Sequence, residues 1–504
     1  MGTTATAAPS KYAKYWTPDG LHHASKLRIY GFNLNNVATN MYFFLMAYAS
    51  YYMIGFVGMA VILASSFATI MRVWDGVTDP FIGYLVDKTN GRFGKNRPFM
   101  IIGNIGLHVT SFIMFNITHL LPENIRVVFF FAVAVVYYIF FTFQNTITRA
   151  GQACLTNDPK QRPLFAMFDG INLLIMSVGL TMYTSNLLVP KYGTMYSAEL
   201  FHDLWVVCFG VSLFCTICAV IAIAPKDRTE FFGTGKPQLV RPRDYWDTIK
   251  HNRAIQMLIV AACTDKIASQ TRVSATGVVL YGVLAGNYAL AGGLTLYTSV
   301  ASAVFCVVGA GFVATRFGQK QALVLGSIGA LIANALSACL WMFGDPKTLN
   351  LPGYAGFTGF TFFTVALILL TILSSGFQGV SGNIVLPMIA DCADYEVYRS
   401  GRYVPGMMGT LFSFVDKCVS AASPMIAGLL FASIGFREAL PDVNTPYSDA
   451  LKYVTLFIMF GMTIIGLIFN LIAMKFYPLN KEKMEEIQAK IAEIKARDSA
   501  EAEA

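Results

Sequence analysis

Two aspartates one helical turn apart interrupt an apolar stretch of the chain, and they are well suited to bind a positive ion. Four polar residues recur there at steps of three and four: Arg72, Asp75, Thr78 and Asp79. On a helix such residues share one face. A charge at the centre of a membrane-spanning helix costs about 2.5 to 3.5 kcal/mol on insertion scales, so this face must meet protein or water. Two neighbouring carboxylates repel each other unless a proton or a metal cation lies between them. The pattern predicts a cation site, and its hard oxygen ligands favour sodium or a proton.

A purely structural interpretation of the same residues stays open. Arg72 precedes Asp75 by three residues, so the two can form a buried ion pair; the interpretation applies less well to Asp79. Pro80 follows directly, and its ring displaces the carbonyl of Gly76. That displacement would free a backbone oxygen beside the carboxylates.

Amides and a guanidinium form a second polar group, in two apolar runs that begin near residues 28 and 125 and are counted below as the first and fourth. They are Asn33, Asn36 and Asn40 in the first run, and Asn145 and Arg149 in the fourth. Their donors and acceptors are those that a polyhydroxylated solute requires, so we predict that they bind substrate. Two alternatives remain: asparagines often join one membrane helix to another, and Arg149 can extend to the membrane interface.

Charged residues also interrupt two apolar runs in the second half of the chain. They are Asp265, Lys266 and Arg272 in the seventh run, and Asp416 with Lys417 in the eleventh. Neighbouring opposite charges suggest ion pairs that exchange partners between states. Sequence neighbours on a helix point in different directions, and we expect Lys417 to face a substrate cavity. The charged group of the seventh run is a further candidate for its lining.

Apolar helices must position all of these side chains. Of the 504 residues, 55% are hydrophobic and 13% charged, against roughly 25% charged in a soluble domain. Twelve apolar runs, each long enough to cross about 30 Å of hydrocarbon, begin near residues 28, 59, 98, 125, 164, 204, 254, 291, 321, 358, 405 and 449. The longest polar interruption divides them into two sets of six, as an internal duplication would. The predicted fold class is an all-α membrane protein with twelve transmembrane helices in two six-helix lobes.

The predicted organisation has five parts: an N-terminal segment (1–27), a first bundle (28–224), a linker (225–253), a second bundle (254–476) and a charged C-terminal helix (477–504). The net charge is 37 − 29 = +8. Lys and Arg collect in alternate loops, which explains this balance better than nucleic-acid binding and predicts that both termini are cytoplasmic. The C-terminal segment has the pattern of a surface helix, and a solvated end without function is its simpler interpretation.

Two sequence motifs resemble the glycoside-pentoside-hexuronide:cation symporter family, which includes melibiose permease. The first is Trp74-Asp75-Gly76-Val77-Thr78-Asp79-Pro80, continued by Gly83, Asp87, Thr89, Arg92, Gly94, Lys95, Arg97 and Pro98. The second is Met388-Ile389-Ala390-Asp391 with Asp394 and Tyr395, followed by Lys417 where the family has its lysine. The resemblance covers about residues 28 to 475 and implies the major facilitator fold.

The resemblance also implies roles for the cation-site residues. In that family two helix-two aspartates bind the coupling cation, helped by a polar residue between them and by a helix-four threonine. The matching residues here are Asp75, Asp79 and Thr142, whereas Thr78 replaces the usual asparagine. The loss of that amide leaves sodium and a proton as alternatives.

The residues aligned with the family's sugar site differ from those of the melibiose binders. Asn36 and Asn145 stand where those transporters have aspartates, and Arg149 stands where they have a sugar-stacking tryptophan. The resemblance therefore implies a glycoside or a hexuronide as substrate, and Arg149 favours an anionic one over a galactoside.

The predicted function is cation-coupled symport of such a solute by alternating access. We expect a monomer in the cell membrane, in contact with lipid, that needs no cofactor other than the coupling ion. A charge network is expected to gate the cytoplasmic side through Arg72, Asp87, Arg92, Lys95, Arg97, Asp391 and Asp394.

Three other functions remain as alternatives: a lysolipid:sodium symporter of the same fold, a non-transporting membrane sensor and a membrane-embedded enzyme. An enzyme is disfavoured because, of six histidines, only His108 lies within an apolar run, and it has no evident partner in the sequence. The amides and Arg149 disfavour a lipid substrate, which would need an apolar cleft.

Overall fold

The computed structural model describes residues 22–89, 91, 93–156, 161–228, 231, 250–272, 274–354, 357–400, 415, 419, 421–487 and 489–490. Over these ranges the regular structure is helical, without a β-strand. The chain folds as two compact units, residues 1–237 with 438–440 and residues 238–437 with 441–504. The break between 237 and 238 falls inside the segment expected to link two bundles.

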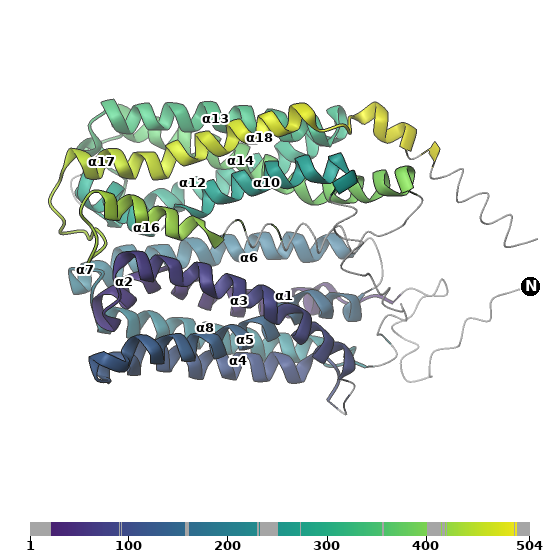
Figure 1. Ribbon diagram of the computed structural model, residues 1–504, viewed down its shortest axis with the longest axis horizontal. Helices are drawn as coiled ribbons and strands as arrows, with labels where there is room; N and C mark the ends of the chain where they lie inside the picture. The colour runs from purple at the N-terminus through teal and green to yellow at the C-terminus, as the bar shows by residue number, and fades with distance from the viewer. Residues whose placement is uncertain are drawn as a thin grey trace, which may run out of the picture. The chain divides into compact units, whose positions relative to one another are not determined.

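Each long helix of the first unit begins within six residues of a start expected from the sequence. Figure 1 labels these helices. Its α-helices are α1 (Lys26–Ala47), α2 (Ala49–Tyr52), α3 (Val61–Lys88), α4 (Arg97–Phe112), α5 (Glu123–Leu155), α6 (Arg162–Met182), α7 (Val189–Tyr192) and α8 (Ala198–Ile223). Shorter π and 3-10 segments extend three of the helices: η2 (Met53–Val57), η3 (Ile113–Ile117), η4 (Thr118–Leu120) and η5 (Tyr183–Leu188). Within this unit α1 packs on α8 and α6, and α5 packs on α3 and α4.

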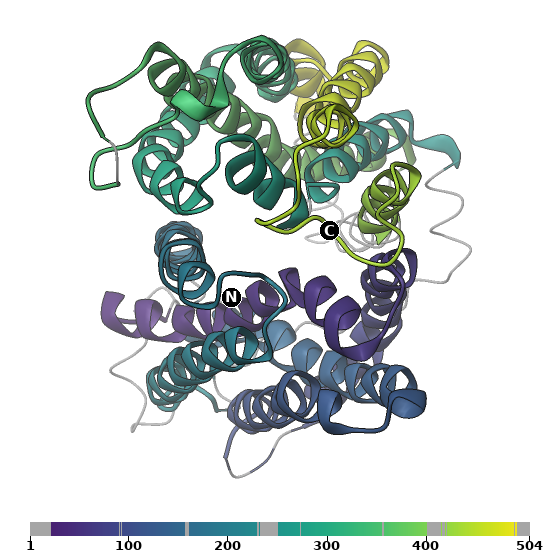
Figure 2. The same ribbon diagram turned by 90° about the vertical axis from the view of Figure 1, so that its left-hand side faces the viewer.

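The second unit has a corresponding set of long helices, several of which are seen close to end-on in Figure 2. Its α-helices are α10 (Arg253–Gln270), α11 (Ser274–Gly277), α12 (Ala289–Phe317), α13 (Gln319–Phe343), α14 (Phe362–Ser400), α16 (Ser423–Ser433), α17 (Asp449–Leu456) and α18 (Met462–Phe476), and its π and 3-10 segments are η7 (Val278–Leu284), η8 (Pro346–Thr348) and η9 (Phe457–Gly461). The eleventh expected span, near residue 405, lies mostly outside the described residues, so the count of twelve spans stays a prediction.

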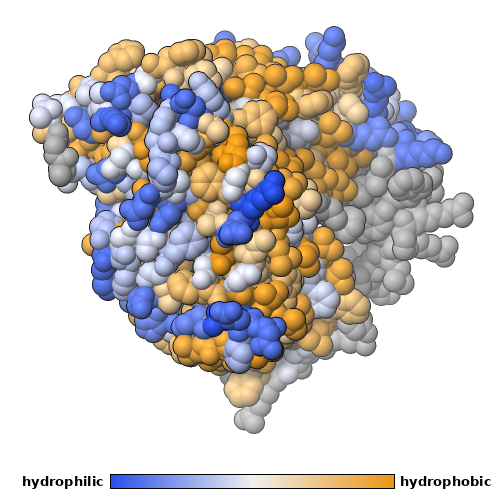
Figure 3. All heavy atoms as spheres, turned by 60° about the vertical axis from the view of Figure 1, so that its left-hand side comes forward, coloured by the Kyte–Doolittle hydropathy of each residue, from blue (hydrophilic) through white to orange (hydrophobic). Residues whose placement is uncertain are grey.

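Within the described ranges, eight helical segments are long and apolar enough to cross a membrane. Three more helices of at least 18 residues, α1, α3 and α10, contain the polar groups identified above. Large hydrophobic side chains such as Phe214, Ile221 and Val307 are exposed, and Figure 3 shows apolar residues over much of the visible surface. Such a surface is expected where lipid rather than water surrounds the helices.

The core of the first unit lies where α1, α3, α4, α5, α6 and α8 meet. Its buried residues include Phe32, Ile82, Phe99, Ile147 and Phe165. Helix α3 is therefore anchored to this core through Ile82 and Val86.

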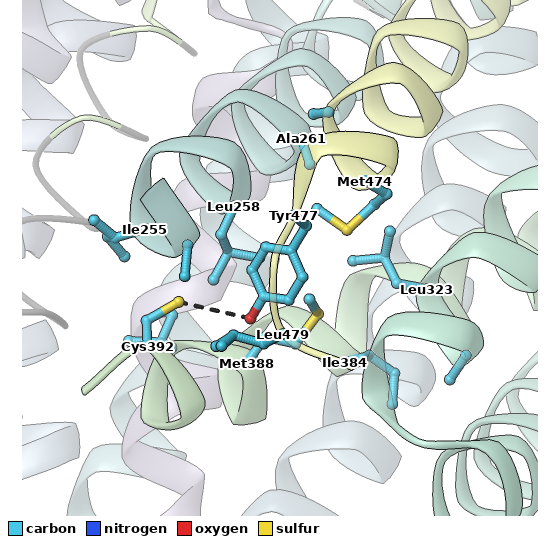
Figure 4. Close-up of a cluster of buried hydrophobic side chains, with 14 of the residues drawn as sticks. Ile255, Leu258, Ala261, Leu323, Ile384, Met388, Cys392, Met474, Tyr477 and Leu479 are labelled. Atoms are coloured by element: carbon cyan, nitrogen blue, oxygen red, sulfur yellow. Dashed lines mark hydrogen bonds between the residues drawn. The ribbon is translucent and has the colours of Figure 1, made fainter. Parts of the chain in front are cut away.

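The core of the second unit includes the chain that follows the last long helix. Tyr477, Leu479 and Ile487 are buried in one cluster with residues of α10, α13 and α14. Figure 4 shows the Tyr477 ring in the middle of this cluster, with its hydroxyl 3.7 Å from the Sγ of Cys392. The interpretation of the segment from Lys481 on as a merely solvated end is therefore wrong for residues 481–487, because Ile487 is buried in this cluster and Met484 packs against it.

Candidate functional site

The carboxylate face of α3 contacts α5 through two threonines. The Oγ1 of Thr142 donates a hydrogen bond of 2.8 Å to Oδ1 of Asp75. The hydroxyl of Thr78 lies 3.4 Å from that of Thr142 and donates to the carbonyl of Asp75 at 3.1 Å. All three residues are buried. The structure thus brings together three of the four residues expected at the cation site, from two different helices.

The remaining member of the site, Asp79, lies one turn after Asp75 on the same helix and is half-buried. The pair α3 and α5 is held in register by Trp74, whose Nε1 donates to the carbonyl of Val135 at 3.1 Å. Carboxylate and hydroxyl oxygens converge at this point, and such oxygens suit a hard monovalent cation or a proton. Arg72 is also half-buried on α3.

The asparagines of α1 face α6, where the structure places a carboxylate that the sequence analysis missed. Asn36 Nδ2 donates to Oδ1 of Asp169 at 3.0 Å, and Asn40 Nδ2 donates to Oδ1 of Asn36 at 3.0 Å. Asn33 is buried and donates to the carbonyl of Phe165 at 3.1 Å. Asn33 thus has the helix-joining role that was one of the two interpretations, whereas Asn36 and Asn40 lie at a polar pocket with Asp169 and Asn172.

Of the other three residues expected to bind substrate, one is described and two are not fully described. Asn145 is half-buried on α5, one turn after Thr142. Arg149 lies one further turn along α5, but its side chain is outside the described part, and Lys417 lies outside the described residues altogether. Their substrate roles therefore stay predictions.

The loop before α4 is held by a buried carboxylate that follows α8. Asp227 accepts hydrogen bonds of 3.0 to 3.1 Å from the backbone N–H groups of Lys95, Asn96 and Arg97. Arg97 Nε also lies 3.4 Å from Oδ2 of Asp227 as an ion pair. Gly94 has φ +94°, and a Cβ there would collide with the Asp227 carboxylate. Two residues of the predicted charge network thus meet an acid placed in the predicted linker.

The lysine beside that acid is also buried, and it ties the N-terminal segment to the unit. Lys226 Nζ donates to the carbonyls of His23 and Leu155 at 2.6 and 2.7 Å and lies 3.2 Å from Nδ1 of His22. Burial lowers the pKa of Lys226 to about 8. Burial, and then the charge of Lys226, lowers the pKa of His22 to about 4.

The remaining residues of the charge network are described in part. Asp391 is half-buried near the end of α14, at a cavity of about 350 Å³ that Lys320 and Lys481 also line. Asp394 is half-buried on the same helix. Arg92 and the side chain of Asp87 lie outside the described part, so the gating role of the set is a prediction.

Arg272 in the second unit is bound by protein groups on three sides. Its Nη2 donates to Thr463 Oγ1 at 2.7 Å and to Asn334 Oδ1 at 3.2 Å, and its Nε donates to the carbonyl of Met459 at 3.1 Å. These bonds join the end of α10 to α13 and to the η9–α18 segment. Asp265 and Lys266 are half-buried on α10. The geometry of Arg272 is that of a helix-joining residue, while cavity lining by this group stays untested.

His108 has a partner that the sequence does not reveal. Its Nδ1 is hydrogen-bonded to the hydroxyl of Tyr42 on α1, and its ring contacts Phe209 edge to face. The sequence shows no evident partner because Tyr42 is 66 positions away in the chain. The contacts are those of a core histidine.

Comparisons with known proteins agree with this architecture. The chain matches the family model described as MFS/sugar transport protein over residues 32–481. It is 24% identical over 471 residues to the glucuronide carrier protein homolog of Escherichia coli K12, which covers 92% of this chain and 94% of that protein. It is 22% identical over 448 residues to the isoprimeverose transporter of Lactiplantibacillus pentosus, covering 87% of each chain.

Solved structures show the same fold at low sequence identity. A crystal structure of a mutant of the nucleoside transporter NupG matches with a TM-score of 0.61 at 12% identity, covering 89% of this chain and 98% of the other. A structure of a proton-dependent oligopeptide transporter matches with a TM-score of 0.55 at 14% identity, covering 92% and 100%. These matches and the family model confirm the major facilitator fold that the helix-two motif implied. The chain therefore belongs to the MFS/sugar transport protein family and is a multi-pass membrane transporter rather than an enzyme.

Proposed function

We propose that this protein is a symporter that couples the movement of sodium or a proton to that of a glycoside or hexuronide. The 2.8 Å hydrogen bond from Thr142 to Asp75 carries the proposal, because it joins the carboxylate pair of α3 to the helix that also presents Asn145. The relatives named as a glucuronide carrier homolog and an isoprimeverose transporter support a sugar-based solute.

The mechanism follows from charge. A cation bound between Asp75 and Asp79 removes their mutual repulsion and lets α3 and α5 hold their contact through Thr142. Asn145, one turn along α5, is then fixed in the orientation that receives substrate. By linkage, bound substrate must tighten cation binding by the same factor. The transporter works by alternating access as a monomer in the cell membrane, with both termini in the cytoplasm.

Uptake into proteoliposomes tests the proposal directly. Isoprimeverose and 4-nitrophenyl β-D-glucuronide are offered to purified protein with an inward sodium gradient, an inward proton gradient, both or neither. We expect accumulation above the outside concentration for at least one solute and one gradient. Equal uptake ratios with and without every gradient would refute coupling. Binding without flux would identify a sensor, and transport of lysophosphatidylcholine in place of both sugars would identify a lysolipid carrier.

Variants connect the result to the site. Asp79→Asn is expected to abolish accumulation while leaving exchange down the substrate gradient. Thr142→Val removes one hydrogen bond to a carboxylate, worth about 1.5 to 3 kcal/mol, so we expect a change of roughly tenfold to hundredfold in cation affinity. Sodium should bind more weakly because a ligand oxygen is lost, whereas a proton should bind more tightly because ionised Asp75 loses its donor. Thr295→Val is the matched control, because the Thr295 hydroxyl donates to Ala291 of its own helix. Wild-type cation affinity in Thr142→Val would remove α5 from the site.

A further inference from the structure

Another carboxylate within the membrane-spanning region lies on α6, apart from the two of the α3–α5 site. Asp169 is half-buried, and its Oδ1 accepts a hydrogen bond of 3.0 Å from Asn36 Nδ2. Among the described side chains, no basic group bonds to Asp169 or acts on its charge. A carboxylate in a spanning helix without a cationic partner is a functional group by default, since its ionised form is costly there.

The orientation of the neighbouring amides is fixed by their own hydrogen bonds. Asn40 Nδ2 donates to both the backbone oxygen and Oδ1 of Asn36. The oxygen of the Asn36 amide is thereby occupied, so its N–H side faces Asp169. Asn36 thus donates to Oδ1 of Asp169, and Asn33 also acts on this carboxylate as a hydrogen-bond partner.

Asn172, one turn after Asp169, adds a hydrogen-bond donor without a partner to the same pocket. Asn172 is 6% exposed, and its Nδ2 has no hydrogen-bond partner in the described structure. It lines a pocket with Asn36, Asn40 and Asp169 that has no room for a water molecule. Its Nδ2 is a donor, so it adds an N–H group to the pocket and offers a metal cation no ligand.

The chemistry of the pocket selects the ligand. The amides of Asn36 and Asn172 present N–H groups, which repel a metal cation, and the pocket is too narrow for a hydrated ion or a sugar ring. A proton fits both restrictions, because protonation of the carboxylate forms an O–H bond, removes the negative charge and adds no volume. We propose that Asp169 is a further coupling carboxylate, which binds one proton at a site separate from Asp75 and Asp79.

The proton affinity of Asp169 is set by the pocket that surrounds it rather than by neighbouring charged groups. Helix α1 packs against α6 and faces Asp169 with Asn33, Asn36 and Asn40, none of which titrates. A titratable group of α1, Tyr30, contacts the residue before Asp169 through its ring against Phe168. Lys26 and Arg28 precede Asn36 by eight or more residues, about 12 Å or more along the helix, and Arg162 begins α6 about 10 Å before Asp169.

The inference deepens the proposed symport and rests on it for the claim that the proton moves with the solute. The proton enters from water when the pocket opens, and it leaves to water after the change of state. No electron is transferred. Sodium at the α3–α5 site and a proton at Asp169 can then both be required in one cycle. Sodium and a proton would then be partners in one transport cycle rather than alternatives.

Infrared difference spectroscopy tests the proton site without any substrate. Purified wild-type protein is titrated from alkaline to acidic pH, and the C=O stretch of protonated carboxyl groups is followed in H₂O and D₂O. We expect Asp169→Asn to lose the band of one carboxyl group and Asp169→Glu to retain it at a shifted frequency. The matched control is Asp203→Asn, because Asp203 pairs with Lys191 at 2.8 Å and is ionised. Identical spectra for wild type and Asp169→Asn would overturn the inference.

Uptake as a function of pH separates this inference from the proposed function. In wild type, we expect the uptake rate at fixed sodium gradient to change by up to about tenfold per pH unit on one limb, as for one titrating group. Asp169→Asn should flatten that limb and keep sodium dependence. Concentrative uptake with an unchanged pH profile in Asp169→Asn would refute the role of Asp169 alone. A carboxyl band assigned to Asp169 without concentrative uptake of either sugar would instead refute the proposed symport and leave the proton site.

Discussion

Replacing Asp227 by Asn should destabilise the first unit more than any exposed charge substitution. Asp227 is fully buried and bonds to three consecutive backbone N–H groups before and at the start of α4, and also to Asn96 Nδ2 at 3.0 Å. The N-terminus of a helix carries unsatisfied N–H groups and a partial positive charge, so an anion is the matching partner. Asn keeps the shape of the side chain, but it replaces one oxygen with an N–H₂ group that faces donors.

The magnitude follows from the number of groups that lose their partner. In the wild type, Oδ2 of Asp227 accepts from the backbone N–H and from the guanidinium of Arg97. In the variant, the NH₂ group of the asparagine would take the place of Oδ2 and face these two donors. Each unsatisfied buried donor costs about 1 to 3 kcal/mol, and breaking a buried ion pair costs about 3 to 5 kcal/mol. For a unit of this size, each kcal/mol lowers the melting temperature by about 2 to 4 °C. We therefore expect a decrease of about 6 to 20 °C.

The assay is thermal unfolding in dodecyl maltoside micelles, followed by tryptophan fluorescence at one heating rate for all variants. Asp203→Asn serves as control, because its ion pair with Lys191 is exposed, and exposed pairs contribute little. Asp227→Glu is a second comparison that keeps the charge but adds a methylene to a tight site. A melting temperature of Asp227→Asn equal to that of the wild type would show that the carboxylate does not hold the loop, and the reasoning would fail.

Two further predictions concern other anchors of the units. Because the pKa of His22 is lowered to about 4 in the folded protein, the unfolded chain binds more protons between pH 4 and 6.5; stability should fall as pH decreases through this window. His22→Gln should remove this part of the pH dependence in melting curves, and an unchanged dependence would contradict it. Ile487→Ala should cost about 2 to 5 kcal/mol, because Ile487 is fully buried. Lys490→Ala is its exposed comparison, and equal melting temperatures for the two variants would show that the C-terminal segment does not anchor the second unit.

The sequence by itself determined the helices and one polar face. Apolar runs fix where helices cross a membrane, because each must satisfy its own backbone hydrogen bonds in lipid. The spacing of Asp75, Thr78 and Asp79 puts them on one side of α3 whatever the rest of the fold does. The family motif then pointed to Thr142, and the structure brings its hydroxyl to Asp75.

Only the tertiary structure decided which polar residues meet across helices. Asp169 is the only acidic residue of α6, so no repeat of carboxylates marks it; its partner Asn36 lies 133 positions away. Asp227 was grouped with a polar linker because its neighbours are hydrophilic, yet the fold places it at the start of α4, 130 positions earlier. Residues 481–487 begin a segment with the amphipathic pattern of a surface helix, and the core of the second unit receives its apolar side. Helix spacing is local and can be read along one chain segment. The register between helices depends on packing of side chains from distant segments, and one sequence taken alone does not specify it.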